Sequence, residues 1–523
     1  MDDILLQQIH SIKEVTLIDG NLTLEEFIAI VKYHAKIRLS QEYEQRIVRC
    51  RSLIEAFLSK GSAIYGVTTG FGDNVKYVIS PEDAVLLQNN ILRSHACSVG
   101  EPLALEEVRA IILMIILNTG KGNSGIKLDT ILLLCAILNQ DLYPFAPGNG
   151  SVGYLAVEAH ICLTLIGDGF FLEENQKIPA AQVLEKHHLT PITLGCKEGL
   201  SLISGTTSAT AFSLLSLFHG ITAYKNIQIA AAMSFEALKG TTKAYDPQVH
   251  RLKRHLSQQI VAEHMRSLLK GSAICLAYRE EKVQDPCLLR TIPQVLGSCL
   301  QLIKESYTTI IDEMQSISDN PVILPEEEDD KSVYMTGNFD GSYIGTHCDM
   351  LSIAYANLGN FVERCTDRLV NHHISNGLPP FLVTNPGLNS GFMIPQYTQA
   401  ALQSELKLLA VPASVDSITT CAGQEDPVSM AYHAGYKSNQ SAKKLLQMTG
   451  ILLMCTAQAL ELTIDSTGLS PSPISAKMME AIRIHVPFVT KDRYLYEDME
   501  VFYHLVTSNK LTELIETDFH LVL

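Results

Sequence analysis

The sequence predicts a mainly α-helical protein with a long central helix bundle and with polar loops at the ends of the helices. Apolar residues recur with helical spacing along most of the 523-residue chain. Strand-like patterns are few and short, and no Gly/Ser-rich linker divides the chain. Several helical segments exceed 20 residues, which is longer than usual for a globular protein and therefore favours a bundle.

Helical periodicity is clearest in six segments. In chain order they are residues 81–95, 104–118, 208–238, 350–371, 397–411 and 438–464. Strand patterns occur at residues 14–18 and near 169–178. We expect three regions: a loop-rich N-terminal region that carries active-site loops (1–200), the long-helix bundle (201–475) and a C-terminal helical segment (476–523).

Composition and charge exclude several functional classes. A hydrophobic fraction of 46% is sufficient for a large core, and a formal net charge of −16 disfavours nucleic acids and anionic membranes as partners. The apolar stretches 199–224 and 445–460 are interrupted or too short, so we expect no membrane span. Twelve scattered cysteines without a C-x-x-C pattern favour a reduced, cytoplasmic protein without a metal site.

Seven polar or glycine-rich breaks separate the helical segments, and rigid helices with such loops at their ends can build a binding site. They are residues 64–73, 148–153, 203–207, 285–291, 318–322, 337–341 and 422–430.

Four of these regions carry motifs of one family. They are Tyr65–Gly72 (YGVTTGFG), Arg290 followed by Pro293–Gly297 (PQVLG), Ser318–Pro321 (SDNP) and Gly337–Phe339 (GNF). Together they resemble the histidine and aromatic amino-acid ammonia-lyases, and the matches follow the family's order from about residue 65 to residue 430. The resemblance implies an ammonia-lyase-like fold and a homotetramer whose sites combine loops from more than one subunit.

Two further motifs indicate the histidine-directed branch. Ser94-His95 and the segment Gln424-Glu425-Asp426 resemble the corresponding segments of histidine ammonia-lyases. A histidine and a glutamate suit an imidazole ring, because they can exchange hydrogen bonds with its two nitrogens. The resemblance therefore implies that His95 and Glu425 hold the ring and manage its protons, with Gln424 assisting.

The chain departs from the family at the segment GNGSVGYLAVEAH, residues 148–160. Family members have Ala-Ser-Gly after the Gly-Ser-Val-Gly turn, and these three residues cyclise into the electrophile methylidene-imidazolone. Here Gly153 is followed directly by Tyr154. Two nearby family residues also differ, with Ser204 in place of Asn and Cys287 in place of Tyr. We therefore expect no prosthetic group and no other cofactor.

A quaternary trimethylammonium group leaves as neutral trimethylamine and cannot bond to an electrophile. The gap therefore favours the ergothionase branch of the family, carbon–nitrogen lyases that convert ergothioneine, an imidazole betaine, to thiolurocanate and trimethylamine. Two alternatives stay open: a histidine ammonia-lyase whose modified residues are missing from the written sequence, and a non-catalytic relative that binds an imidazole metabolite.

The resemblance also implies roles for the remaining candidate residues. Tyr65 is the candidate base that removes a proton from the carbon beside the ring. Arg290 binds the substrate carboxylate, and Asn320 supports it. Asp340 and Tyr154 are candidates for contact with the substrate cation.

One lysine lies close enough to Glu425 in sequence to be considered as a cation near the site, in addition to Arg290. Lys437, 12 residues after Glu425, is expected to be a surface lysine instead.

Overall fold

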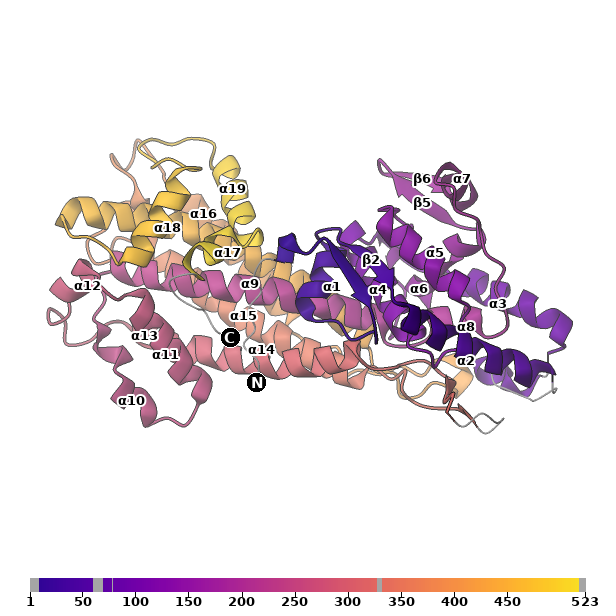
Figure 1. The fold of residues 1–523 in the computed structure, drawn as a ribbon. Coiled ribbons are helices and arrows are strands. Elements are labelled where there is room, and N and C mark those ends of the chain that lie inside the picture. The colour runs from indigo at the N-terminus through magenta and orange to yellow at the C-terminus, as the bar shows by residue number, and fades with distance from the viewer. Residues whose placement is uncertain (1–8, 60–68, 78, 327–331, 517–523) are drawn as a thin grey trace.

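The computed structural model describes residues 9–59, 69–77, 79–326 and 332–516. Helices dominate it, as predicted (Figure 1). Four long helices run along the molecule, the segments that contain α1–α8 gather at one end, and α10–α13 lie at the other end. This arrangement places the loops of the N-terminal region beside one end of the long helices.

The central bundle is formed by α9 (Thr207–Ala237), α14 (Ile292–Met314), α15 (Ser342–Val370) and α17 (Ala431–Thr467). All 31 residues of α9 are buried, which requires helices or loops on every side of it. Small residues allow close packing: an added Cβ at Gly220 of α9 would lie 2.5 Å from Cε1 of Tyr355 in α15. The packing of α9 against α15 and α17 therefore organises the core.

The other helices surround this bundle. Those of the N-terminal region are α1 (Leu24–Val31), α2 (Gln41–Ser59), α3 (Pro81–His95), α4 (Leu105–Gly120), α5 (Leu128–Asn139), α6 (Ala156–Leu163), α7 (Ala180–Lys186) and α8 (Glu198–Ile203). The later ones are α10 (Pro247–Arg251), α11 (Leu256–Leu268), α12 (Ala273–Ala277), α13 (Cys287–Arg290), α16 (Met393–Leu409), α18 (Pro473–Arg483), α19 (Leu495–Thr507) and α20 (Lys510–Glu516).

In the described part of the chain the strands form four two-stranded sheets, and the 3-10 helices are short. β1 (Glu14–Leu17) pairs in parallel with β2 (Lys36–Leu39). The antiparallel pairs are β3 (Val99–Pro102) with β4 (Pro147–Asn149), β5 (Phe170–Glu173) with β6 (Gln176–Pro179), and β7 (Val322–Ile323) with β8 (Val333–Tyr334). The 3-10 helices are η1 (Ile9–Ser11), η2 (Gly72–Lys76), η3 (Thr164–Ile166), η4 (Thr242–Tyr245), η6 (Pro380–Leu382) and η7 (Cys421–Gly423).

All six predicted helical segments are helices, and both predicted strand regions contain strands. α15 begins eight residues before the predicted start and α17 begins seven residues before it. Both early turns include loop-like Gly and polar residues, whose local preference for helix is low, so tertiary packing extends the helices there. The division of the chain into regions 1–200, 201–475 and 476–523 stays a prediction.

Two described segments, Glu198–Ala237 and Ala431–Thr467, are long and apolar enough to cross a membrane by length and composition. Their most apolar 18-residue windows are 100% and 83% buried in the fold. Core helices of soluble proteins pass the same test, so these segments are weak evidence for a membrane protein.

A buried ion pair anchors the short helix α8. Lys197 Nζ lies 2.6 Å from Asp319 Oδ2, both side chains are 0% exposed, and Nζ also donates to Ser201 Oγ at 2.7 Å. Asp319 Oδ1 accepts a hydrogen bond from the backbone N–H of Asn320 at 2.7 Å. The pair therefore links the start of α8 to the loop that carries Asn320.

We predict that Gly220→Ala destabilises the protein by about 1–3 kcal/mol, because the new methyl group overlaps the Tyr355 ring in a close-packed core. Urea denaturation followed by circular dichroism measures the change. Gly337→Ala is the control, since nothing lies within 4 Å of an added Cβ there. Equal midpoints for the two variants would contradict the close packing of α9 on α15.

Lys197→Met is predicted to lower the free energy of unfolding by about 3–5 kcal/mol, because it leaves the carboxylate of Asp319 buried without a cation. Lys186→Met is the matched control. Its Nζ pairs with Glu173 while 61% exposed, and exposed pairs contribute only about 0–1 kcal/mol. Similar losses in the two variants, measured in urea, would show that the buried pair does not anchor α8.

Candidate active site

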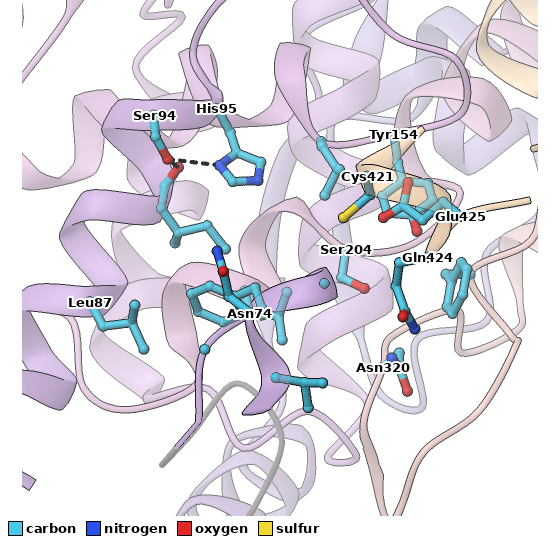
Figure 2. Close-up of a pocket in the computed structure, with 18 of the residues that line it drawn as sticks. Asn74, Leu87, Ser94, His95, Tyr154, Ser204, Asn320, Cys421, Gln424 and Glu425 are labelled. Atoms are coloured by element: carbon cyan, nitrogen blue, oxygen red, sulfur yellow. Dashed lines mark hydrogen bonds between the residues drawn. The ribbon is translucent and has the colours of Figure 1, made fainter. Parts of the chain in front are cut away.

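A cavity of about 870 Å³ lies at the end of the bundle that carries the N-terminal helices. Its walls come from α3, η2, the turn before α6, the end of α8, the loops on either side of β7 and β8, and the η7 loop. Figure 2 shows Ser94 and His95 on one side, and Tyr154, Cys421, Gln424 and Glu425 on the other. Segments that are far apart in sequence therefore meet in one cavity.

His95 is the last residue of α3, which places its imidazole at the cavity wall. Ser80 caps the start of this helix by accepting from the backbone N–H of Asp83. Ser94 Oγ lies 3.0 Å from His95 Nδ1. Burial lowers the pKa of His95 from its ordinary value, and the nearby charge of Glu425 only partly opposes this. The ring is therefore neutral at pH 7.

Gln424 and Glu425 follow η7 in the loop between α16 and α17. The backbone N–H of Thr420 donates to the Glu425 carbonyl at 3.1 Å, and Thr420 Oγ1 donates to Glu425 Oε2 at 3.2 Å. The loop also contains Cys421 at φ 51° and Ala422 at φ 55°. Such left-handed conformations of non-glycine residues are costly and gather at functional sites. The loop is thus held in a shape that presents Glu425 to the cavity.

Asn320 lines the cavity opposite α3 and connects two loops. Its Oδ1 accepts a hydrogen bond from the backbone N–H of Thr336 at 2.9 Å. Thr336 and the neighbouring Met335 and Phe339 also line the cavity. The asparagine therefore fixes the loop that supplies the aromatic ring of Phe339.

Ser204 lines the cavity at the end of α8, and its loop is tied down by buried polar groups. Asn118 Nδ2 donates to the Ser204 carbonyl at 3.3 Å, and the Thr206 N–H donates to Ser318 Oγ at 3.1 Å. Gly205 has φ +106°, and an added Cβ would lie 2.5 Å from Ser318 Oγ. Only glycine fits between these partners, so the Ser204 loop has a fixed position.

The turn at the predicted gap is closed and hydrogen-bonded. Ser151 Oγ donates to the Tyr154 carbonyl at 2.8 Å and accepts from the Gly153 N–H at 3.2 Å. Leu155 has φ 89° and ψ −66°, the rare γ-turn conformation that is strained for an L-residue. α6 begins at the next residue, Ala156. Two residues, Tyr154 and Leu155, therefore connect Gly153 to the helix.

One turn further along α6, a fully buried carboxylate joins this turn to α9. Glu158 Oε1 accepts from Thr207 Oγ1 at 2.9 Å and from the Ser208 N–H at 3.1 Å, at the positive N-terminus of α9. Burial raises the pKa of Glu158, although these hydrogen bonds act in the opposite direction. Glu158 does not line the cavity, but it holds α6 against the Ser204 loop.

The residues present do not fit methylidene-imidazolone. Formation of that ring consumes a serine hydroxyl and a glycine nitrogen from Ala-Ser-Gly, whereas this chain has Tyr154 and Leu155 directly after Gly153. Leu155 is occupied in the strained turn that starts α6. No step of a mechanism can therefore be assigned to this group. Among the described residues, no cluster of three or more His, Cys, Asp or Glu is arranged to hold a metal ion.

Tyr154 instead presents an aromatic ring to the cavity (Figure 2). Its ring centroid lies 5.5 Å from that of Phe339, with 57° between the planes. This is a favourable tilted arrangement for two aromatic rings.

Two candidate residues, Arg290 and Asp340, do not line the cavity in the described part of the chain. Arg290 belongs to α13, at the opposite end of the bundle (Figure 1), and its Nε donates to the Asp285 carbonyl at 2.7 Å. Asp340 Oδ1 accepts from the backbone N–H of Ser342, the first residue of α15, at 2.9 Å. Tyr65 lies outside the described residues. The substrate roles of all three stay predictions.

The expectation that Lys437 is a surface lysine is wrong. Its side chain is 6% exposed, and Nζ lies 2.6 Å from Asp349 Oδ1. Lys437 lies on the inner face of α17. Helix packing determines which residues lie on that face, and the distance in sequence from Glu425 does not predict it.

Sequence reasoning missed several residues that line the cavity. Asn74 and Tyr77 follow the predicted loop 64–73, Thr336 precedes the loop 337–341, and Cys421 precedes the loop 422–430. Each lies within four residues of a predicted loop, so extending every loop by one helical turn would have included them.

Comparisons with known proteins agree on the family. The family model "Aromatic amino acid lyase" matches residues 22–484. The chain is 40% identical over 506 residues to a histidine ammonia-lyase of Symbiobacterium thermophilum, covering 96% of this chain and 98% of that protein. The structure of histidine ammonia-lyase from Trypanosoma cruzi superposes with a TM-score of 0.89 at 33% identity, covering 97% and 96% of the two chains.

The expectation of ergothionase activity is wrong. The structure of ergothionase from Treponema denticola is also similar, with a TM-score of 0.85 and coverage of 95% and 99%, but it is only 25% identical. The gap after Gly153 is a local change, whereas the similarity to histidine ammonia-lyases extends over nearly the whole chain. Loss of an electrophile does not by itself identify the leaving group.

Four findings agree: the order of the motifs, the helical bundle, the cavity between its loops and the similarity over residues 22–484. The chain belongs to the aromatic amino acid lyase family.

Proposed function

We propose that the protein is a cytoplasmic carbon–nitrogen lyase that eliminates ammonia from histidine to give urocanate. The observation that carries the proposal is the placement of His95 and Glu425 on opposite sides of one cavity, in a chain 40% identical to a histidine ammonia-lyase. An imidazole ring has one donor and one acceptor nitrogen when neutral, so groups on two sides can hold it.

In this proposal each side of the cavity binds one ring nitrogen. Glu425 accepts a hydrogen bond from the N–H of the substrate ring. His95 is neutral, and Ser94 occupies its Nδ1, so the N–H at Nε2 is the donor that faces the other ring nitrogen. Gln424 supplies a further amide beside Glu425. The ring, held at both nitrogens, can accept electron density while the proton on the neighbouring carbon leaves.

The elimination breaks the C–H and C–N bonds and forms the second bond of C=C and a bond between the base and the proton. A base removes the proton from the carbon beside the ring, the C–H electron pair becomes the new C=C bond, and the C–N pair leaves with the amine nitrogen. A protonated amine leaves as neutral ammonia, a much better leaving group than an amide ion. Tyr65 is the proposed base, and a site that lowers its pKa would favour this role.

The carboxylate of the substrate needs a cation from outside this cavity, because none of the described lining residues is Lys or Arg. We propose that Arg290 of a neighbouring subunit supplies it in a homotetramer, with Asn320 as a nearby hydrogen-bond partner. A guanidinium can bind a carboxylate through two parallel hydrogen bonds.

A second candidate function is reversible binding of histidine without turnover. The observation that favours it is the direct Gly153–Tyr154 connection, which leaves no residues for an electrophile. This function uses the same cavity and the same ring contacts, so only a measurement of product separates it from the lyase.

We predict that the purified full-length protein converts histidine to urocanate, followed by ultraviolet absorbance, and that its intact mass equals that of the unmodified chain. Binding of histidine without urocanate would support the non-catalytic function. If calorimetry detects no binding, both functions fail. A DNA sequence that encodes Ala-Ser-Gly between codons 153 and 154 would overturn the conclusion that the prosthetic group does not fit.

Glu425→Gln and His95→Phe are each predicted to weaken histidine binding roughly 10- to 100-fold. This is the usual loss when one hydrogen bond between a ligand and a buried polar side chain is removed. Asp426→Asn is the matched control, because Asp426 bonds to Thr419 and does not line the cavity. Isothermal titration calorimetry measures the dissociation constants. Unchanged affinity in both variants would exclude the proposed ring contacts.

The lowered pKa of His95 also gives a pH dependence. His95 stays neutral until the pH falls below the ordinary histidine range, near pH 6.5, and protonation below that range places a positive charge beside a substrate that already carries an ammonium group. The affinity advantage of the wild-type protein over His95→Phe is therefore expected to be constant from pH 8 to pH 6.5 and to fall only in more acidic solution. A loss of this advantage already above pH 7 would contradict a neutral, buried His95.

A further inference from the structure

Tyr154 lies at the position after Gly153, where the family's precursor residues would begin. Tyr154 follows Gly153 in a turn whose backbone is fixed by Ser151 and by the strained conformation of Leu155. Such strain persists only where the surrounding structure holds it. The Tyr154 ring is therefore fixed at the cavity wall.

Phe339 completes this part of the wall from a different segment. Its ring lies 5.5 Å from Tyr154, and the 57° tilt leaves the faces of the two rings unstacked. Asn320 holds the loop of Phe339 through its bond to Thr336. Both rings belong to the lining of the cavity and are only partly buried, so a ligand can contact them.

The charges around the cavity favour a cation at these rings. Among the described lining residues Glu425 is the one carboxylate, and Lys and Arg do not occur. Figure 2 shows Glu425 on the same side of the cavity as Tyr154. An aromatic face attracts an ammonium group through its quadrupole, and a carboxylate nearby adds to this attraction.

We propose that Tyr154 and Phe339 form a subsite for the protonated α-amine of the ligand, where other family members carry an electrophile. The inference rests on the proposed histidine-directed function and names the recognition of the amine at that site. The rings stabilise the charged form of the amine, and this form departs as neutral ammonia when the C–N bond breaks. The proton already on nitrogen stays with it, so the step needs no further reactant.

The test compares two ligands that differ only at the amine: histidine and 3-(imidazol-4-yl)propionate, which keeps the ring and the carboxylate. Calorimetry at neutral pH measures both dissociation constants for the full-length wild-type protein and its variants, and absorbance follows urocanate in parallel. We expect Tyr154→Leu and Phe339→Leu each to weaken histidine binding roughly 3- to 30-fold, with less than about a twofold change for the propionate.

Tyr154→Phe and Phe339→Tyr are the matched controls, because each keeps an aromatic face at the same place. Each is expected to bind histidine more tightly than the leucine variant at the same position. Circular dichroism melting curves show whether each leucine variant is folded, and a variant that still binds the propionate has an intact cavity. For wild-type protein, the preference for histidine is expected to decrease as the pH rises through the pKa of the amine.

The outcomes separate the subsite from the function on which it rests. Equal losses for both ligands, or no loss for either in the leucine variants, would overturn the amine subsite alone. Tyr154→Phe that binds histidine as weakly as Tyr154→Leu would overturn it as well, since the phenol and not the ring would be responsible. Failure of wild-type protein to bind either ligand would overturn the proposed function and the subsite together.

Discussion

The complete burial of α9 determines how the other long helices pack in this structure. A helix without a solvent face needs partners all round, and α15 and α17 supply them along its length. Their starting ends then lie together: an added Cβ at Gly341 would lie 2.5 Å from the Ala431 Cβ and 3.7 Å from Thr206, and one at Gly153 would lie 3.6 Å from Ser429. The loops before α6, α9, α15 and α17 therefore meet beside the cavity because the core requires it.

This arrangement explains how the site stays ordered without the family's precursor residues. The positive N-terminus of α9 is matched by the buried carboxylate of Glu158 on α6, so two helix ends are joined directly. The Ser204 loop is fixed by Asn118 and Ser318, and α8 is fixed by the buried pair of Lys197. The cavity is thus built by interactions that do not involve a prosthetic group. Tyr154 and Phe339 give this part of the cavity an aromatic surface, which is the proposed contact for the amine.

The single chain presents a cavity suited to a ring and an ammonium group, but the described lining offers no cation for a carboxylate. Arg290, the residue with the matching chemistry, lies with α13 at the far end of the bundle. A site assembled from several subunits reconciles these two facts, because the far end of one chain can then complete the cavity of another. Oligomerisation and substrate binding are linked in that case.

Much of the fold and part of the site follow from the sequence. Helical patterns located three of the four long bundle helices, α9, α15 and α17, but the six predicted segments did not include α14. The motifs at His95, Asn320 and Glu425 identified residues that line the cavity. The direct connection of Gly153 to Tyr154 was also visible in the sequence. Contacts between distant segments were not, since local patterns do not encode them: Tyr154 beside Phe339, the buried pair of Lys437, and the separation of Arg290 from the cavity arise from how the helices pack. The sequence pattern of one helix predicts that helix alone, whereas the site depends on how several helices and loops pack together.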